Sequence, residues 1–305
     1  MANITVVTEF VLLGFSILPH LLLPFFCLVF LSYIIATAGN FLIITIVLLN
    51  SKIQSPMYFF LFNLAVIDIC FINTTIPNLL KNVLTKKKAI SVAHCLTQSY
   101  FFFLAGTAEF ILLGVMSADR YLAICYPLHY TSIMKRHVCI QLIFGVWFGS
   151  FFSTFFSVIF VIRLKFCFSE IDHFFCDVGP LLRNSCTDTE YIEKLSLASS
   201  SLMIMSLLVT LVSYFKIVMA VFKINSAEGR QRLFTTCSSH AIVVSLAYGS
   251  CIFLYLLPAQ SQGSSIHKKV SVLNTIIVPL INPYIYTLRN QNVKEAVYDI
   301  ILKKH

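Results

Sequence analysis

The sequence predicts an all-α membrane protein, a bundle of seven transmembrane helices with a short amphipathic C-terminal helix. Hydrophobic residues make up 58% of the 305 residues and charged residues only 11%, so a soluble domain of this composition would lack the polar surface to cover itself. Seven apolar segments, each long enough for the ~20 residues that cross a bilayer, alternate with short polar ones. The segments are continuously apolar rather than alternating, which disfavours a β-barrel.

The predicted helices follow the apolar segments in chain order. They lie near 23–49, 56–80, 92–125, 138–162, 194–223, 231–257 and 270–289. Residues 1–22 are then an N-terminal tail, 23–289 the bundle, and 290–305 a cytoplasmic helix and tail. In the last region four apolar residues recur at helical spacing between lysines, which is typical of a helix lying on the membrane: Val293, Val297, Ile300 and Ile301.

The charge distribution predicts an extracellular N-terminus. No Lys or Arg precedes Lys52, so the N-terminal region lacks the basic part of a cleavable signal peptide, and we expect the first helix to act as its own anchor. The lysines at 86–88 would be extracellular and weaken the argument, but the segments assigned to the cytoplasm hold most of the excess of 22 basic over 13 acidic residues. The sequon at Asn3 would face the compartment where glycosylation occurs.

The cysteines divide between the two sides of the membrane. Cys95 begins the third helix, and Cys167, Cys176 and Cys186 lie in the long loop between the fourth and fifth helices. In this topology all four face the oxidising compartment, where four cysteines allow three pairings, and the spacing does not choose among them. The other six lie in or beside apolar helices, where Cys behaves as a small hydrophobic residue.

Six ordered motifs cover nearly the whole chain. They are Gly39-Asn40, PMYFFL at 56–61 with Asp68 farther in, MSADRYLAICYPLHY at 116–130, IDHFFCD at 171–177, RLFTTCSSH at 232–240 and PLINPYIYTLRN at 279–290. This combination resembles the tetrapod-type class of olfactory receptors, within the rhodopsin-like G-protein-coupled receptors. Ala118, Ala65 and Leu233 depart from residues usual in that family, which bears on details of coupling rather than on the fold.

The resemblance implies a function and a covalent framework. It implies a receptor, not an enzyme, that binds a small-molecule odorant and activates a stimulatory, olfactory-type heterotrimeric G protein, which raises cyclic AMP. It also implies the disulfides Cys95–Cys176 and Cys167–Cys186, and a location in the plasma membrane of olfactory cilia. The expected partners are the odorant, the G protein and membrane lipid; no nucleic acid is expected.

Two acids lie inside apolar helices. An ionised carboxylate there costs at least a few kcal/mol, so Asp68 and Glu109 are expected to face the bundle interior and to have a role. With Asn40 and Asn282 they form an oxygen-rich cluster that suits a hard cation, and similar receptors hold Na⁺ there. The alternative is a pair of neutral carboxylic acids hydrogen-bonded to Asn and Ser.

The predicted switch lies at the cytoplasmic end. Asp119 is expected to pair with Arg120 at rest, and a released Arg120 would reach a G-protein helix. Asn282-Pro283 offers a hinge, because Pro283 removes one helical hydrogen bond. The remaining members of the predicted switch are Tyr121, Tyr214, His240 and Tyr286. The alternative for Tyr214 and His240 is a role as interfacial anchors.

The ligand site is predicted in the outer half of the bundle. The outer third helix carries no charge for an amine, which favours a small apolar molecule. The predicted lining is Phe102, Phe103, Gly106, Thr107, Leu202, Met203, Tyr248, Cys251, Ile252 and Tyr255; ordinary packing is the alternative for each Phe. The cytoplasmic groove for the G protein would be bordered by Arg120, Lys135, Arg136, Lys223, Arg230 and Arg232.

Other classes of function make different demands on the sequence. A transporter predicts inverted repeats and broken helices at the midplane, and the sequence has neither pattern. An intramembrane enzyme needs paired acids or a metal motif; Asp68 and Glu109 imitate a carboxylate pair, but no hydrolytic motif accompanies them. Within receptors, the alternative is a chemosensory protein that acts on a metabolite outside the nose.

Overall fold

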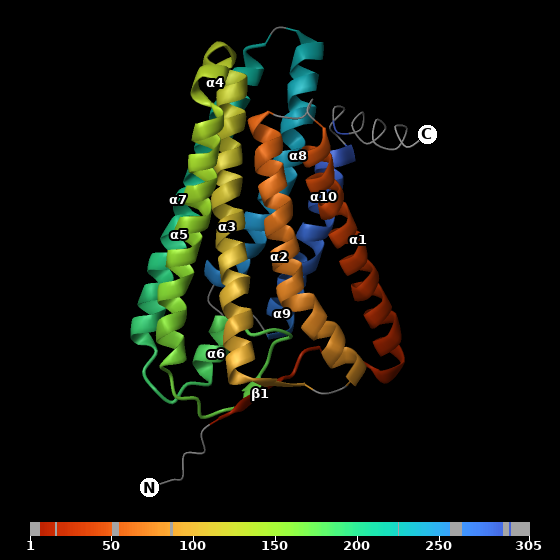
Figure 1. Ribbon diagram of the computed structural model, residues 1–305, viewed down its shortest axis with the longest axis vertical. Coiled ribbons are helices and arrows are strands. Elements are labelled where there is room, and N and C mark those ends of the chain that lie inside the picture. The colour runs from red at the N-terminus through yellow and green to blue at the C-terminus, as the bar shows by residue number, and fades with distance from the viewer. Residues whose placement is uncertain are drawn as a thin grey trace.

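The computed structural model describes residues 7–15, 17–50, 55–85, 88–224, 226–256, 264–288 and 293. Asn3 and nearly all of the predicted C-terminal helix lie outside these residues. Long helices run side by side along the longest axis of the molecule (Figure 1). They are α1 (Leu22–Leu49), α2 (Pro56–Thr85), α3 (Val92–Cys125), α5 (Arg136–Ile162), α7 (Glu190–Phe222) and α8 (Ala227–Cys251), which continues as the π-helix η2 (Ile252–Leu256).

Six helical segments in the described part of the chain are long and apolar enough to cross a membrane. The seventh crossing consists of three consecutive helical pieces: α9 (Ser264–Val272), the π-helix η4 (Leu273–Ile277) and α10 (Val278–Leu288). Each predicted apolar segment therefore coincides with a helix, within several residues at its ends. In the described part of the chain, the remaining short helices are η1 (Pro19–Leu21), α4 (Pro127–Ile133) and α6 (Val178–Arg183).

The outer surface of the bundle is apolar. Four phenylalanines recur every fourth residue on α5, and each ring contacts the next: Phe144, Phe148, Phe152 and Phe156. Their exposed fractions lie between 38% and 67%. A soluble protein rarely exposes such a continuous apolar patch, so this face of α5 fits contact with lipid.

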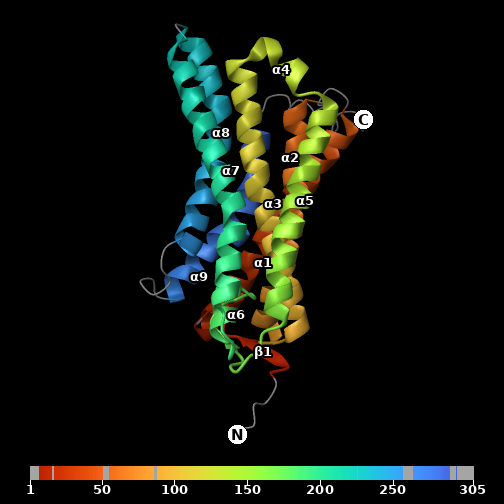
Figure 2. The same cartoon turned by 90° about the vertical axis from the view of Figure 1, so that its left-hand side faces the viewer.

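A small three-stranded sheet closes one end of the bundle. Strand β1 (Glu9–Leu12) pairs antiparallel with β2 (Ala89–Ser91) and parallel with β3 (Glu170–Ile171). Phe10 and Leu12 point inward from β1 and are 0% and 1% exposed. Part of the region assigned to an N-terminal tail is thus a strand that packs on the loops before α3 and α7. We call this the sheet end; α4 lies at the opposite end, called the α4 end (Figure 1 and Figure 2).

Two lysines fasten the turn that follows β1. Gly14 has φ +64°, a left-handed conformation that Gly adopts without steric cost. The carbonyl oxygens exposed by this turn accept hydrogen bonds, Leu13 from the Lys88 ammonium at 2.8 Å and Gly14 from the Lys268 ammonium at 2.9 Å. Lys88, one of three lysines that weaken the charge argument for topology, therefore has a structural role.

Candidate ligand and switch sites

Two disulfides hold the long loop between α5 and α7 at the sheet end. They are the predicted pairs, Cys95–Cys176 and Cys167–Cys186, each with Cα atoms 5.4 Å apart. Gln98 adds a polar contact, because its Oε1 accepts from the Cys176 amide at 3.1 Å and its Nε2 donates to the Thr74 carbonyl at 2.9 Å. The loop is therefore fixed to α3 by one covalent bond and to α2 and α3 through one side-chain amide.

An aromatic cluster lies directly beneath this loop. Phe102 of α3 packs on Phe71 of α2, with ring centroids 4.6 Å apart, and on Phe175 of the loop at 4.4 Å. Phe103 contacts Phe102 edge-on at 5.3 Å. A Cβ at Gly106, one turn farther along α3, would lie 3.4 Å from the Phe71 ring, so the small residue lets the ring approach the helix.

Deeper in the bundle, three helices share a buried polar contact. The hydroxyl oxygens of Ser206 (α7) and Tyr248 (α8) lie 2.6 Å apart, and both lie within hydrogen-bond distance of the Phe110 carbonyl of α3. Next to them, the Cys251 thiol lies 3.2 Å from the Met203 sulfur. Hydroxyl and sulfur atoms from α7 and α8 therefore lie close together in the interior of the bundle. They are a few polar atoms in an otherwise apolar region.

The predicted ligand-lining residues are distributed unevenly. Phe102, Tyr248 and Cys251 are buried, whereas Leu202 is 36% exposed and belongs to the apolar surface of α7. Partly buried positions make up most of the rest: Phe103, Gly106, Thr107, Met203 and Ile252. The backbone of Tyr255 belongs to η2, and its side chain lies outside the described residues. Their contact with ligand stays a prediction.

The four residues of the predicted cation cluster are all buried, with exposed fractions of 1% or 2%. The amide of Asn282 donates to both carboxylate oxygens of Asp68, at 3.0 and 3.3 Å. The amide of Asn40 donates to the carbonyls of Ala36 and Pro279.

Three side-chain oxygens of this cluster accept no hydrogen bond from the described residues. They belong to Asn40 (Oδ1), Glu109 (Oε1) and Asn282 (Oδ1). Buried acceptors without a donor are costly, and oxygen atoms of this kind are the ligands that a hard cation takes. The residues present therefore fit a bound Na⁺.

At the α4 end, Asp119 has a partner that sequence reasoning missed. Asp119 is 2% exposed, and its Oδ1 accepts a hydrogen bond from the Tyr130 hydroxyl of α4 at 2.8 Å. Burial, and next the negative charge of Asp119, raise the pKa of Tyr130, so its phenol stays protonated and donates. Among the described residues no salt bridge joins Asp119 to Arg120, so the expected resting pair is absent from this conformation.

Two of the predicted switch residues join α7 to α8. The Tyr214 hydroxyl lies 2.7 Å from Nδ1 of His240, and their rings are parallel within 6°. His240 is 2% exposed, and its Nε2 has no hydrogen-bond partner in the described part of the chain.

The remaining predicted switch residues lie around this group. The Tyr121 hydroxyl lies 3.4 Å from that of Tyr126. Tyr286 is 8% exposed. Pro283 packs against α1, where a Cβ added at Gly39 would lie 2.9 Å from its ring. Of the predicted groove cations, Arg120 is half-buried and four are exposed: Lys135, Arg136, Lys223 and Arg230. The side chain of Arg232 lies outside the described residues.

These features together define a seven-helix transmembrane receptor. Residues 39–286 match the family described as 7 transmembrane receptor (rhodopsin family). The fold agrees with the crystal structure of squid rhodopsin, with a TM-score of 0.69 over 93% of this chain and 87% of the rhodopsin chain at 16% identity.

Curated relatives refine this class. The human olfactory receptor 2AP1 is 45% identical, with 99% of both chains covered. The human olfactory receptor 6X1 is 46% identical, with 97% of this chain and 96% of the relative covered. The chain therefore belongs to the olfactory receptors of the rhodopsin family. Such proteins are multi-pass membrane receptors and not enzymes, which excludes the transporter and intramembrane-enzyme alternatives.

Proposed function

We propose that this receptor binds a small, mostly apolar odorant between the disulfide-bonded loop and the Ser206–Tyr248 contact, and activates a stimulatory G protein that raises cyclic AMP. The observation that carries the proposal is the buried aromatic cluster of Phe71, Phe102 and Phe175 beneath the loop. Apolar walls with a few placed hydroxyls are typical of small-molecule sites. The names of the human relatives support an odorant rather than a metabolite as the ligand.

The proposed orientation places the sheet end outside the cell. Both disulfides lie at that end, and disulfides form in the oxidising compartment. The α4 end, with its exposed Lys135 and Arg136, then faces the cytoplasm in agreement with the positive-inside rule. We place the receptor in the plasma membrane of olfactory cilia by analogy with its relatives.

The proposed signal passes from the aromatic cluster to Arg120. The odorant shifts the equilibrium only through its different affinities for the two conformations. Tyr248 and His240 both belong to α8, so a displacement of α8 by ligand at Tyr248 also moves the Tyr214–His240 contact beside Arg120. The opened α4 end then admits the C-terminal helix of the G protein, and Arg120 donates to it.

Replacing Arg120 with alanine is expected to abolish the cyclic AMP response to an odorant that activates the wild-type receptor. The guanidinium is the charged donor of the proposed G-protein contact, and alanine removes it without a substitute. The measurement is a cyclic AMP reporter in cells that carry an olfactory-type G protein, with an N-terminal tag to quantify receptor at the surface.

Arg163→Ala is the matched control, because Arg163 is an exposed arginine at the sheet end. It is expected to respond as the wild type does. A full response from surface-displayed Arg120→Ala would refute the role given to Arg120, whereas silence of the wild type across a chemically broad odorant panel would count against the proposed ligand class.

We also infer that Asn40, Asp68, Glu109 and Asn282 hold Na⁺ in the resting receptor, where the ion supplies positive charge to buried oxygens. In purified receptor, Na⁺ at tenfold excess over its Kd should raise the thermal unfolding midpoint by roughly 3–5 °C, corresponding to about 1.4 kcal/mol. Asp68→Asn should lose this increase, because it removes the charge and keeps the side-chain shape. Equal midpoints of the wild type in Na⁺ and in N-methylglucamine of the same ionic strength would exclude the ion.

A further inference from the structure

Gln98 is a buried polar residue that joins α3 to two other segments. It lies on α3, three residues after Cys95, and it is 4% exposed. Its Oε1 accepts a hydrogen bond from the Cys176 amide at 3.1 Å, and its Nε2 donates to the Thr74 carbonyl of α2 at 2.9 Å. Glutamine is seldom fully buried, and here burial is tolerated because both polar groups of the carboxamide have backbone partners.

The two contacts determine the orientation of the Gln98 carboxamide. A backbone amide only donates and a backbone carbonyl only accepts, so the oxygen of Gln98 must face Cys176 and its nitrogen must face Thr74. The reversed orientation would place donor against donor and acceptor against acceptor. Each contact therefore depends on a different atom of the carboxamide, and an apolar side chain at this position makes neither.

The three backbone segments that this carboxamide joins carry the three rings of the aromatic cluster. Phe102 lies one turn farther along α3. Phe175 directly precedes Cys176 in the loop, and its ring centroid lies 4.4 Å from that of Phe102. Phe71 lies about one turn before Thr74 on α2, and its ring centroid lies 4.6 Å from that of Phe102. The side chain at 98 thus connects the backbones behind all three rings.

The disulfide alone does not fix the direction of the loop at Phe175. Cys95–Cys176 is one point of attachment, and the chain on either side of a single attachment can still turn about it. The hydrogen bond from the Cys176 amide to Gln98 adds a second attachment to α3. Two attachments fix the direction of the peptide that follows Phe175, and this direction determines where the ring lies on Phe102.

The contact with α2 lies where that helix is weak. Pro77 lies inside α2 and has no N–H for the Asn73 carbonyl, so the helix lacks one hydrogen bond beside Thr74. The Gln98 amide donates to the Thr74 carbonyl in this same turn. It therefore holds α2 against α3 close to Phe71.

We propose that Gln98 is a positioning residue of the odorant site, which holds Phe71 and Phe175 on Phe102 in the arrangement that binds the odorant. This inference rests on the proposed function, in which the odorant lies against these rings. Gln98 acts through the rings, because its own polar atoms are bonded to backbone groups. Without these bonds a smaller fraction of receptors has the rings in this arrangement, and the apparent odorant affinity falls by that fraction.

Gln98→Met tests the proposal, because methionine keeps the unbranched shape of the side chain and removes both hydrogen bonds. The probe is the most potent odorant that the panel identifies for the wild type. Its half-maximal concentration in the cyclic AMP assay should rise about 10-fold, the effect of one net hydrogen bond. The maximal response should stay that of the wild type, since the α4 end is unaltered. Gln141→Met is the matched control, because Gln141 is exposed on α5, and it should change neither quantity.

A double variant separates positioning from a general loss of stability. Phe175→Leu removes a ring that Gln98 is proposed to position. If Gln98 acts through this ring, Gln98→Met should raise the half-maximal concentration by a smaller factor in the Phe175→Leu receptor than in the wild type. Equal factors in the two backgrounds would overturn the positioning role, as would a Gln98→Met receptor that fails to reach the surface, since the residue would then be needed for folding itself.

Hydrogen exchange of purified full-length receptor in detergent tests the contact without odorant or G protein. Gln98→Met should speed exchange of the Cys176 amide roughly 10-fold, and Gln141→Met should leave it unchanged. Unchanged exchange in Gln98→Met would overturn the proposal, as would an unchanged half-maximal concentration in the surface-displayed variant. Silence of the wild type to every odorant would instead count against the proposed function, and faster exchange would still support Gln98 as the residue that holds the loop.

Discussion

Cys176→Ser and Cys95→Ser are each expected to remove the receptor from the cell surface. The disulfide closes a segment with a sequence separation of 81 residues. In a flexible chain, the disulfide that closes a loop of this length contributes about 4.5 kcal/mol. After tertiary unfolding, α3 and α5 remain helical in the membrane, so only a shorter part of the closed loop is flexible. The contribution of the disulfide then falls toward about 3 kcal/mol, the value for a loop of ~15 residues. Either value is a large part of a typical stability of ~5–15 kcal/mol.

The second disulfide provides an internal comparison. Cys167–Cys186 spans a separation of only 19 residues within one loop, and its opening leaves the bond from that loop to α3 intact. Cys186→Ser should therefore reduce surface display less than Cys176→Ser does. Cys27→Ser is the control, because Cys27 is a free cysteine exposed on α1. Surface staining of tagged receptors, divided by total expression, measures all of these variants.

A particular ranking would contradict this account. If Cys186→Ser reduced surface display more than Cys176→Ser, then the closed conformation of the loop, and not its link to α3, would limit folding.

The crossing helices were predictable from sequence because the bilayer sets their length and polarity. A segment such as 92–125 is long and mostly apolar, and the third helix has those bounds. The strand β1 was not predictable in the same way. Glu9–Leu12 is four residues long, and its partners lie about 80 and 160 positions away, so no local pattern announces the pairing.

The candidate sites were also only partly predictable, because the sequence does not show which distant residues come into contact. Asp68 and Asn282 were predicted to face inward because a polar side chain inside an apolar helix avoids lipid, and the structure joins them by two hydrogen bonds. Tyr130 was missed as the partner of Asp119, because its place in the turn at 127–130 gives no sign of its direction. Ser206 was missed because serine is common in transmembrane helices and does not identify its partner.

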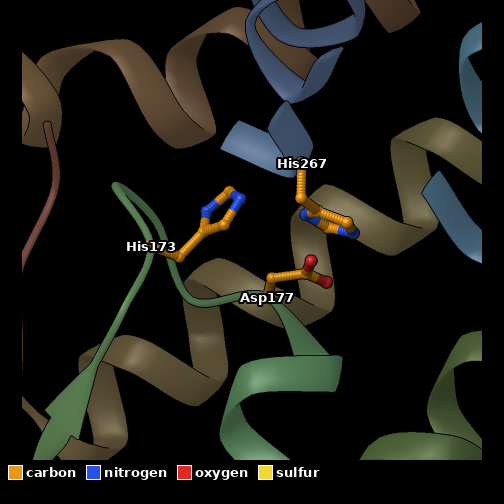
Figure 3. Close-up of side chains that lie close together, drawn as sticks. All are labelled: His173, Asp177 and His267. Carbon is orange, nitrogen blue, oxygen red and sulfur yellow. The ribbon is translucent and has the colours of Figure 1, made fainter. Parts of the chain in front are cut away.

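The close approach of His173, Asp177 and His267 was missed for a third reason (Figure 3). His173 and Asp177 stand in a motif that was read as a mark of family resemblance, and His267 lies in a polar stretch before the seventh helix. Only the packing of the loop on α9 brings polar atoms of the three side chains within 4.8 Å of one another. Sequence spacing predicts a contact between residues of one element, and these residues belong to two.

Gly114→Ala is expected to destabilise the receptor by about 1–3 kcal/mol, although alanine is the better helix former. A Cβ at Gly114 would lie 2.3 Å from the Ser206 hydroxyl and 3.3 Å from the Ser206 Cα, which belongs to the backbone of α7. Either α3 and α7 separate, or Ser206 rotates and gives up its contacts with Tyr248 and the Phe110 carbonyl. Overpacking that separates the helices costs about 1–3 kcal/mol, and a buried hydroxyl that loses its partners also costs about 1–3 kcal/mol.

Thermal unfolding in detergent measures this effect, and two variants identify its cause. Gly145→Ala is the control, because Gly145 lies on exposed α5 with no atom within 4 Å of an added Cβ; it should be neutral or stabilising by up to about 1 kcal/mol. Ser206→Ala removes the oxygen that clashes, so Gly114→Ala combined with Ser206→Ala should cost less than the sum of the two single changes. If the stability losses of the two single variants add up in the double variant, the Ser206 hydroxyl does not limit the close approach of α3 and α7 at Gly114. The contact between Ser206 and Tyr248 would then form independently of the distance between these helices.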